Sequence, residues 1–210
     1  MNLDAENTKL ETRSFQSTLG IERRAAKGDE PEGTFLSGHA AVFDKLSDNL
    51  GGFREKIDPG AFADVLKDDV RALFNHDSNI VLGRTAAGTL KIKQDSEGLH
   101  YEVDLPDTQQ ARDLALSVER GDINQSSFGF IVEDDDWAED DEGRIVRTIR
   151  SFRSLFDVSP VTFPAYPDTT VGKRSMDLYL KQTADERKMT GIEERDMLKR
   201  KTRLQELAIR

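Results

Sequence analysis

The chain of 210 residues carries 30 Lys and Arg against 40 Asp and Glu. The resulting net charge of −10 argues against a general DNA or RNA binder, because phosphate contacts require clustered basic side chains. The absence of cysteine excludes disulfides, thiolate zinc sites and cysteine nucleophiles, and no apolar run approaches a membrane span or a signal peptide, so we expect a soluble protein that is intracellular or at least made inside a cell.

Alternating apolar and polar residues predict strands along most of the chain. A turn, DSEG, joins two of them into a hairpin, and the predicted strands are Thr34–Phe43, Phe53–Ile57, Val70–Asn75, Thr89–Gln94, Gly98–Leu105, Ser126–Val132, Arg144–Phe152 and Leu155–Phe163. Two helices are predicted, a short one over Ala61–Lys67 and one over Thr108–Arg120 that ends at Gly121. The fold class is therefore mainly β, a barrel or sandwich with one or two helices, and the 11 Phe can supply its core.

The C-terminal residues differ in composition from the rest of the chain. Residues 173–210 hold 11 Lys and Arg and 7 Asp and Glu, a net charge of +4, which leaves −14 for the first 172 residues. Tyr179 is the only aromatic residue after Tyr166, so this tail cannot build a core of its own, and we place a domain boundary near Gly172. Its pattern predicts two helices separated by Gly191, either solvated or docked on a partner.

Three histidines limit where a proton-transferring imidazole can lie. His39 and His100 fall within predicted strands. His76 lies in the sequence NHD, just after the apolar run RALF, and strand ends are where a rigid scaffold presents reactive side chains. A lone histidine is more often structural than catalytic, so this position alone does not assign a role to His76.

Two adjacent serines, Ser126 and Ser127, lead into an aromatic strand that contains Gly129. Glycine within a strand often marks a close approach by another backbone or a ligand, although serine at a strand start is also a common turn residue. A serine nucleophile requires a base and a third group that orients the base, for which Asp77, Asp157 and other carboxylates are available.

The acidic run 133–142 has eight carboxylates in ten residues. It could hold Ca²⁺, but it lacks the glycine and the ligand spacing of an EF-hand loop, so we expect a solvated hairpin tip kept open by charge repulsion. The chain also lacks a phosphate-binding glycine loop, HExxH and GxSxG, and no cofactor or metal is expected.

Several motifs in a fixed order together resemble the prohead (capsid-maturation) proteases of tailed phages of the HK97 type. They are GHAAVFD, EKIDPGAF, ALFNHD, LGRTAAGTLKIKQDSEGLHYEVDLPDT, SSFGF followed by a Trp, and LFDVSPVTFPAYPDT, and the resemblance covers about residues 13–172. It implies a serine endopeptidase with a β-barrel and surrounding helices like the herpesvirus assemblin protease. The expected organisation is a flexible segment 1–12, a protease domain 13–172 and a charged helical tail 173–210.

The resemblance also implies roles for individual residues. His76 matches the family's NHD histidine, the general base, and Ser127 matches the serine of the SFGF motif, the nucleophile. Asp157 stands where relatives often have Glu and is assigned as the group that orients His76. Herpesvirus relatives use a second histidine for this task, which leaves His39 and His100 as alternatives. Arg84, in LGRT, is a speculative oxyanion donor whose alternative is a surface ion pair.

The partners implied by the family are the major capsid protein and a scaffold, cleaved inside the procapsid in the host cytoplasm, with self-cleavage and, by analogy with assemblin, a homodimer. Neither nucleic acid nor membrane is expected as a partner. Two alternatives stay open from the sequence. One is a protease-fold assembly factor with little or no proteolysis, and the other is a metal-dependent hydrolase that uses His76, Asp77 and the acidic run.

Overall fold

The computed structural model describes residues 10–16, 18–25, 32–163, 173–185 and 188–189. The chain divides into two compact units, Met1–Val171 and Gly172–Arg210. In the second unit residues 173–185 are helical; the rest of the predicted tail, and most of the predicted flexible segment 1–12, lie outside the described residues. Across the described ranges, no helix has the length and apolar character needed to cross a membrane.

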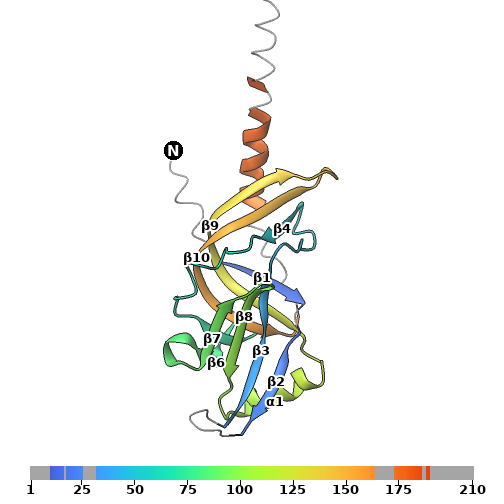
Figure 1. The fold of residues 1–210 in the computed structure, drawn as a ribbon. Helices are drawn as coiled ribbons and strands as arrows, with labels where there is room; N and C mark the ends of the chain where they lie inside the picture. Colours follow the sequence, from blue (N-terminus) through green and yellow to red (C-terminus); the bar gives the residue numbers. More distant parts are fainter. Residues whose placement is uncertain (1–9, 17, 26–31, 164–172, 186–187, 190–210) are drawn as a thin grey trace, which may run out of the picture. The chain divides into compact units, whose positions relative to one another are not determined.

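The larger sheet of the first unit is built around two long antiparallel strands, β9 (Gln125–Glu139) and β10 (Ile145–Val161), which run side by side in Figure 1. Its order is β1-β9-β10-β5-β6, with β1 at Glu11–Gln16, β5 at Arg71–Phe74 and β6 at Asp77–Arg84. A further strand, β4 (Phe53–Ile57), pairs with the first part of β10. Because β10 has 17 residues, β4 and β5 both pair with it in parallel, one after the other.

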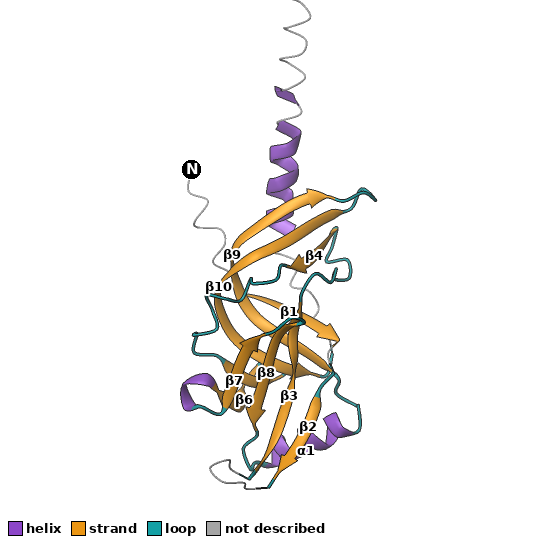
Figure 2. Cartoon of the chain, in the orientation of Figure 1, coloured by secondary structure: helices purple, strands orange, loops and turns teal. Residues whose placement is uncertain are grey.

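The second sheet is antiparallel, with the order β2-β3-β8-β7. Its strands are β2 (Gly20–Arg24), β3 (Gly33–Val42), β8 (Gly98–Asp104) and β7 (Leu90–Gln94), and the 3-10 turn η2 (Thr85–Ala87) precedes β7. The helix α1 (Gln109–Glu119) begins where the Thr108 hydroxyl accepts a hydrogen bond from the Ala111 N–H, and it buries Ala111, Leu114, Ala115 and Val118. Figure 2 shows how strongly strands predominate in this unit.

The predicted mainly-β class is confirmed, but the predicted barrel is not. Closure requires the first and last strands of a sheet to pair. In the described part of the chain both sheets stay open, ending on β1 and β6 in one and on β2 and β7 in the other.

Several predicted boundaries were wrong for local reasons. Residues 61–67 form consecutive turns closed by the Ala63 N–H to Gly60 carbonyl and Val65 N–H to Phe62 carbonyl bonds, since so short a segment rarely nucleates an α-helix. The two strands expected at 144–152 and 155–163 are the single strand β10, which passes through irregularities in its pairing with β9. The strands β1, β2 and β6 were not predicted.

The acidic run 133–142 lies at the end of a hairpin and most of its residues are exposed, as expected, but most of it is strand. Strand β9 extends to Glu139, opposite Ile145, and arginines of β10 pair with three of its carboxylates. Arg150 pairs with Asp136 at 2.7 Å, and Arg153 pairs with Glu133. These cross-strand pairs offset part of the repulsion that the composition alone suggested.

A cluster of four buried charged side chains ties β1 and β4 to the central strands. This buried charge cluster consists of Glu11, Arg13, Glu55 and Arg147, each at most 5% exposed. Arg13 Nε donates to Glu55 at 2.8 Å, and Arg147 Nη1 donates to Glu55 at 3.0 Å and to Glu11 at 3.1 Å. Buried charges of this kind are tolerated because each has an opposite partner within hydrogen-bond distance.

One face of β9 carries the aromatic core. Phe128 and Phe130 stack at a centroid distance of 4.6 Å, and Phe152 and Phe62 pack against them. Because side chains alternate along a strand, the residues between these phenylalanines, Ser127 and Gly129, point to the opposite face. The core thus fixes the strand whose other face carries the polar residues described next.

Candidate active site

Four residues of the central strand pair share one face of the sheet. Ser127 and Gly129 of β9 lie opposite Ser159 and Asp157 of β10 respectively. Positions two apart in a strand point the same way, so the register alone brings these residues together. Ser127 and Ser159 have no exposed surface, and Asp157 is 8% exposed.

His76 reaches this face from a tight turn. Residues Asn75 and His76 form the two-residue connection between β5 and β6, since Phe74 pairs directly with Asp77. Both have positive φ, 55° and 57°. Two successive positive values are typical of the type I′ hairpin, which favours Asn followed by Gly, and a residue other than Gly at the second position is strained in a way that concentrates at functional sites.

Asn75 attaches this turn to β10. Its backbone N–H donates to the Pro160 carbonyl at 3.1 Å, its side-chain amide donates to the Thr162 hydroxyl at 3.2 Å, and its side-chain carbonyl accepts from the Thr162 N–H at 2.8 Å. These bonds hold the turn beside the strand that carries Asp157.

The imidazole of His76 lies between a carboxylate and a hydroxyl. Its Nδ1 is 2.6 Å from Asp157 Oδ2, and its Nε2 is 2.6 Å from Ser127 Oγ. With the proton on Nδ1, the imidazole donates to the carboxylate and its free Nε2 accepts from the serine hydroxyl. This arrangement can move a proton from Ser127 to His76 while the charge of Asp157 stabilises the imidazolium.

The neighbouring serine faces the other way. The Ser126 hydroxyl lies 2.9 Å from the Tyr101 hydroxyl, and both residues are fully buried. Burial raises the pKa of Tyr101 despite the hydrogen bond to Ser126, so the phenol stays protonated. Strand alternation therefore separates two adjacent serines, of which Ser127 alone contacts His76.

The other two histidines lie in the second sheet. His39 Nε2 contacts Asp95 Oδ2 at 3.0 Å, and its ring meets that of His100 edge to face at a centroid distance of 5.2 Å. Burial, followed by the charges of Lys93 and His39, lowers the pKa of His100. His39 and His100 were alternatives for orienting His76, but the contact to His76 Nδ1 comes from Asp157.

Arg84 and Asp77 have other partners. The Arg84 guanidinium donates from Nε to Asp69 at 2.8 Å on the exposed surface, which matches the surface ion pair weighed for it. Asp77 accepts from the Asn79 backbone and side chain, both at 2.8 Å, and so closes the start of β6. Among the residues that the structure describes, no group of three or more His, Asp or Glu side chains has the arrangement of a metal site.

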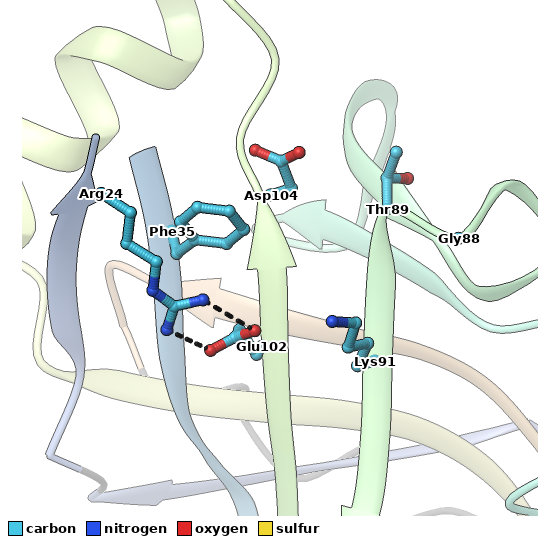
Figure 3. A pocket seen from close by; sticks show the side chains of 7 residues that line it. All are labelled: Arg24, Phe35, Gly88, Thr89, Lys91, Glu102 and Asp104. Atoms are coloured by element: carbon cyan, nitrogen blue, oxygen red, sulfur yellow. Dashed lines mark hydrogen bonds and ion pairs between the residues drawn. The ribbon is translucent and has the colours of Figure 1, made fainter. Parts of the chain in front are cut away.

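A surface pocket of about 260 Å³ lies away from this site, on the second sheet. Figure 3 shows Arg24 crossing it to Glu102, with the guanidinium over the Phe35 ring at 4.2 Å. The pocket is lined by Arg24, Phe35, Gly88, Thr89, Lys91, Glu102 and Asp104, so it is separate from His76 and Ser127.

One feature of the site was not predicted from the sequence, and a second was interpreted only in part. Ser159 donates its hydroxyl to Asp157 Oδ2 at 2.7 Å, and its position two residues after Asp157 in a strand was a usable signal. Gly129 was interpreted as a sign that another backbone or a ligand approaches this strand closely. In the structure the group that approaches is the Asp157 carboxylate. A Cβ at residue 129 would lie 2.5 Å from Asp157 Oδ1.

Comparisons with known proteins identify the family of the chain and its fold. A sequence profile described as caudovirus prohead serine protease matches residues 20–182. The prohead protease of Enterobacteria phage HK97 is 32% identical over 155 residues, which are 70% of this chain and 64% of that relative. Among solved structures, the capsid assembly protease of bacteriophage T4 aligns with a TM-score of 0.52 at 12% identity, over 74% of this chain and 98% of that one, which shows a shared fold.

Proposed function

This chain belongs to the family of caudovirus prohead serine proteases, and on that premise we propose that it is a serine endopeptidase with Ser127 as nucleophile, His76 as general base and Asp157 as the group that orients His76. The observation that carries the proposal is the unbroken hydrogen-bonded series from Asp157 through His76 to Ser127, with both contacts at 2.6 Å. Such a series is the arrangement that activates an otherwise weak serine nucleophile.

The first half of the reaction forms an acyl-enzyme. As Ser127 Oγ attacks the peptide carbonyl carbon, its proton moves to His76 Nε2, and the carbonyl electrons move to oxygen. His76 then gives this proton to the departing amine as the C–N bond breaks. Asp157 keeps the imidazole in the tautomer with its proton on Nδ1 and stabilises the imidazolium between the two transfers.

The second half releases the acyl group. A water molecule attacks the ester carbon, gives its proton to His76 Nε2, and Ser127 Oγ recovers a proton as the C–O bond breaks. The same three side chains therefore serve both halves, and the cycle leaves the enzyme unchanged.

The proposed substrates follow from the family. They are segments of a scaffold and of the major capsid protein, together with the protease itself, cut inside the procapsid in the host cytoplasm during head maturation. The HK97 relative bears the name prohead protease and the T4 structure the name capsid assembly protease, which supports this assignment.

Co-expression with the major capsid protein of the same phage tests the proposal. We expect the wild-type chain to shorten the capsid protein, and Ser127→Ala to leave it intact while folding normally by circular dichroism. Equal cleavage by wild type and Ser127→Ala would contradict the assignment and point to another nucleophile or a contaminating protease, whereas intact capsid protein with both would favour an assembly factor.

A further inference from the structure

Ser159 is a fourth polar residue of the site, and the mechanism above gives it no task. It lies on β10 two residues after Asp157 and directly opposite Ser127. Its side chain has no exposed surface. A buried hydroxyl must satisfy its hydrogen-bonding groups within the protein, so its partners indicate its role.

The partner of Ser159 is the carboxylate that faces the imidazole. Ser159 Oγ donates to Asp157 Oδ2 at 2.7 Å, and this same oxygen accepts from His76 Nδ1 at 2.6 Å. The hydroxyl oxygen also lies 3.5 Å from His76 Nδ1. One carboxylate oxygen is thus held from two directions, by the group it orients and by a neighbour on its own strand.

Gly129 fixes the other side of the carboxylate. Asp157 Oδ1 lies only 2.5 Å from the ideal position of a Cβ at residue 129, so any side chain there would collide with the carboxylate. The terminal torsion of an aspartate is soft and has two broad minima. The gap at Gly129 and the hydroxyl of Ser159 therefore select one rotation of this carboxylate.

We propose that Ser159 is a positioning residue that holds Asp157 Oδ2 toward His76 Nδ1. The proposal rests on the proposed function, because it assigns a task within the same site. Without the Ser159 hydroxyl the carboxylate can turn away from Nδ1, and a misplacement of about 1 Å in a catalytic group lowers the rate by about 100-fold. We therefore expect the chemical step to slow by about 10- to 100-fold while binding is unchanged.

A biotinylated fluorophosphonate measures the step without knowledge of the cleavage site. Its phosphorus bonds to Ser127 Oγ, fluoride leaves, and the serine proton passes to His76, so the maximal labelling rate reports activation and the half-saturating concentration reports binding. We expect Ser159→Ala to lower only the maximal rate. Ser159→Thr keeps a hydroxyl and should restore it within a few-fold.

A spectroscopic signal separates positioning from general destabilisation. The proton between His76 Nδ1 and Asp157 should give a downfield ¹H resonance in wild type and Ser159→Thr that moves upfield or disappears in Ser159→Ala. Ser126→Ala is the matched control, because Ser126 is an equally buried, hydrogen-bonded serine on the other face of the sheet. We expect it to lower thermal stability and to leave the maximal labelling rate and the resonance unchanged.

The outcomes are distinct for the two proposals. Unchanged labelling and an unchanged resonance in Ser159→Ala, or an equal loss of labelling in Ser126→Ala, would overturn the positioning role alone. Labelling that persists in Ser127→Ala would overturn the proposed function itself, whatever Ser159 does. If Ser159→Ala does not fold, failure of a folded Ser159→Thr to label at a rate near wild type refutes the inference.

Discussion

At the scale of single residues, replacing the Asp157 carboxylate with an amide of nearly equal shape tests whether the site depends on its charge. Asp157→Asn keeps the volume but presents an amide to His76 Nδ1 and favours the wrong tautomer, with Nε2 protonated and unable to accept from Ser127. We expect the maximal fluorophosphonate labelling rate to fall by about 10³- to 10⁴-fold, with little change in thermal stability. Asp77→Asn, beside His76 but bonded only to Asn79 in the described structure, is the control and should stay within a few-fold of wild type.

The gap at Gly129 allows a second residue-scale prediction. In Gly129→Ala the new methyl group meets the movable end of Asp157, so the carboxylate shifts and activity should fall at least 10-fold with a small change in melting temperature. In Gly98→Ala the new Cβ would lie 1.9 Å from the Ala41 carbonyl oxygen, which is rigid backbone, and stability should fall sharply instead. Labelling rate and thermal unfolding of both variants check this contrast; the reverse pattern would refute it.

Much of this site could be predicted from the sequence, but not all of it. Resemblance singled out His76, Ser127 and Asp157, which the structure brings within hydrogen-bond distance, while their catalytic roles stay predictions. It could not choose between Asp157 and a second histidine, because strand register decides which groups meet. Ser159 was overlooked since a serine before proline is unremarkable until the strand and its register are known.

At the scale of elements, the turn that carries His76 depends on Asn75. Asn75→Ala loses two side-chain hydrogen bonds to Thr162 and places a residue that disfavours positive φ at 55°. We expect a loss of about 1–3 kcal/mol in the free energy of unfolding and slower labelling of Ser127. Asn75→Gly tolerates the positive φ but lacks the hydrogen bonds, so urea unfolding should place it between wild type and Asn75→Ala. Equal stability of all three would show that the turn does not depend on Asn75.

The strands and helices that were predicted correctly are those whose signals lie within their own residues. The hairpin of β7 and β8 and the helix α1 were predicted nearly as found, because alternation, a turn, helical spacing and a terminating glycine are all local signals. Strand β6 was missed because its residues DSNIVLGR hold few alternating apolar positions, and its pairing to β5 defines it. The acidic half of β9 was not predicted as strand because the arginines that pair with it lie on another strand and give no local signal.

At the scale of the whole molecule, the buried charge cluster predicts sensitivity to acid. Burial alone would raise the pKa of Glu55, but the charges and hydrogen bonds of Arg13 and Arg147 outweigh it and lower that pKa. A carboxyl whose folded pKa lies below its unfolded value of about 4.3 stabilises the protein above that pH, and this contribution is lost as the pH falls through the folded pKa.

The melting temperature measured from pH 7 to pH 3 checks this prediction. Wild type should lose stability below about pH 4.3. Glu55→Gln should be less stable at pH 7, by about 3–5 kcal/mol, with a shallower acid decline, because it leaves the buried Arg13 and Arg147 with Glu11 as the one remaining carboxylate of the cluster. Glu133→Gln, which removes one exposed cross-strand pair, should keep the wild-type profile; the same change in both variants would contradict the role of the cluster.

The charge of the tail predicts that catalysis and incorporation into procapsids depend on different parts of the chain. Residues 173–210 carry a net charge of +4 against −14 for the remainder, which suits docking of the tail to an acidic partner such as a helical scaffold. Deletion of 173–210 should leave Ser127 labelling intact and abolish incorporation into procapsids, measured by immunoblotting of purified particles. Loss of labelling in the deletion variant would argue against this separation of functions.

The burial of Ser127 has a consequence for timing. A side chain without exposed surface is out of reach of a passing polypeptide, although the imidazole beside it is only partly covered. If Ser127 is the nucleophile, as proposed above, its attack on a substrate or on a fluorophosphonate first requires a small local opening around this hydroxyl. The frequency of that opening then sets an upper limit on the rates of labelling and of peptide cleavage.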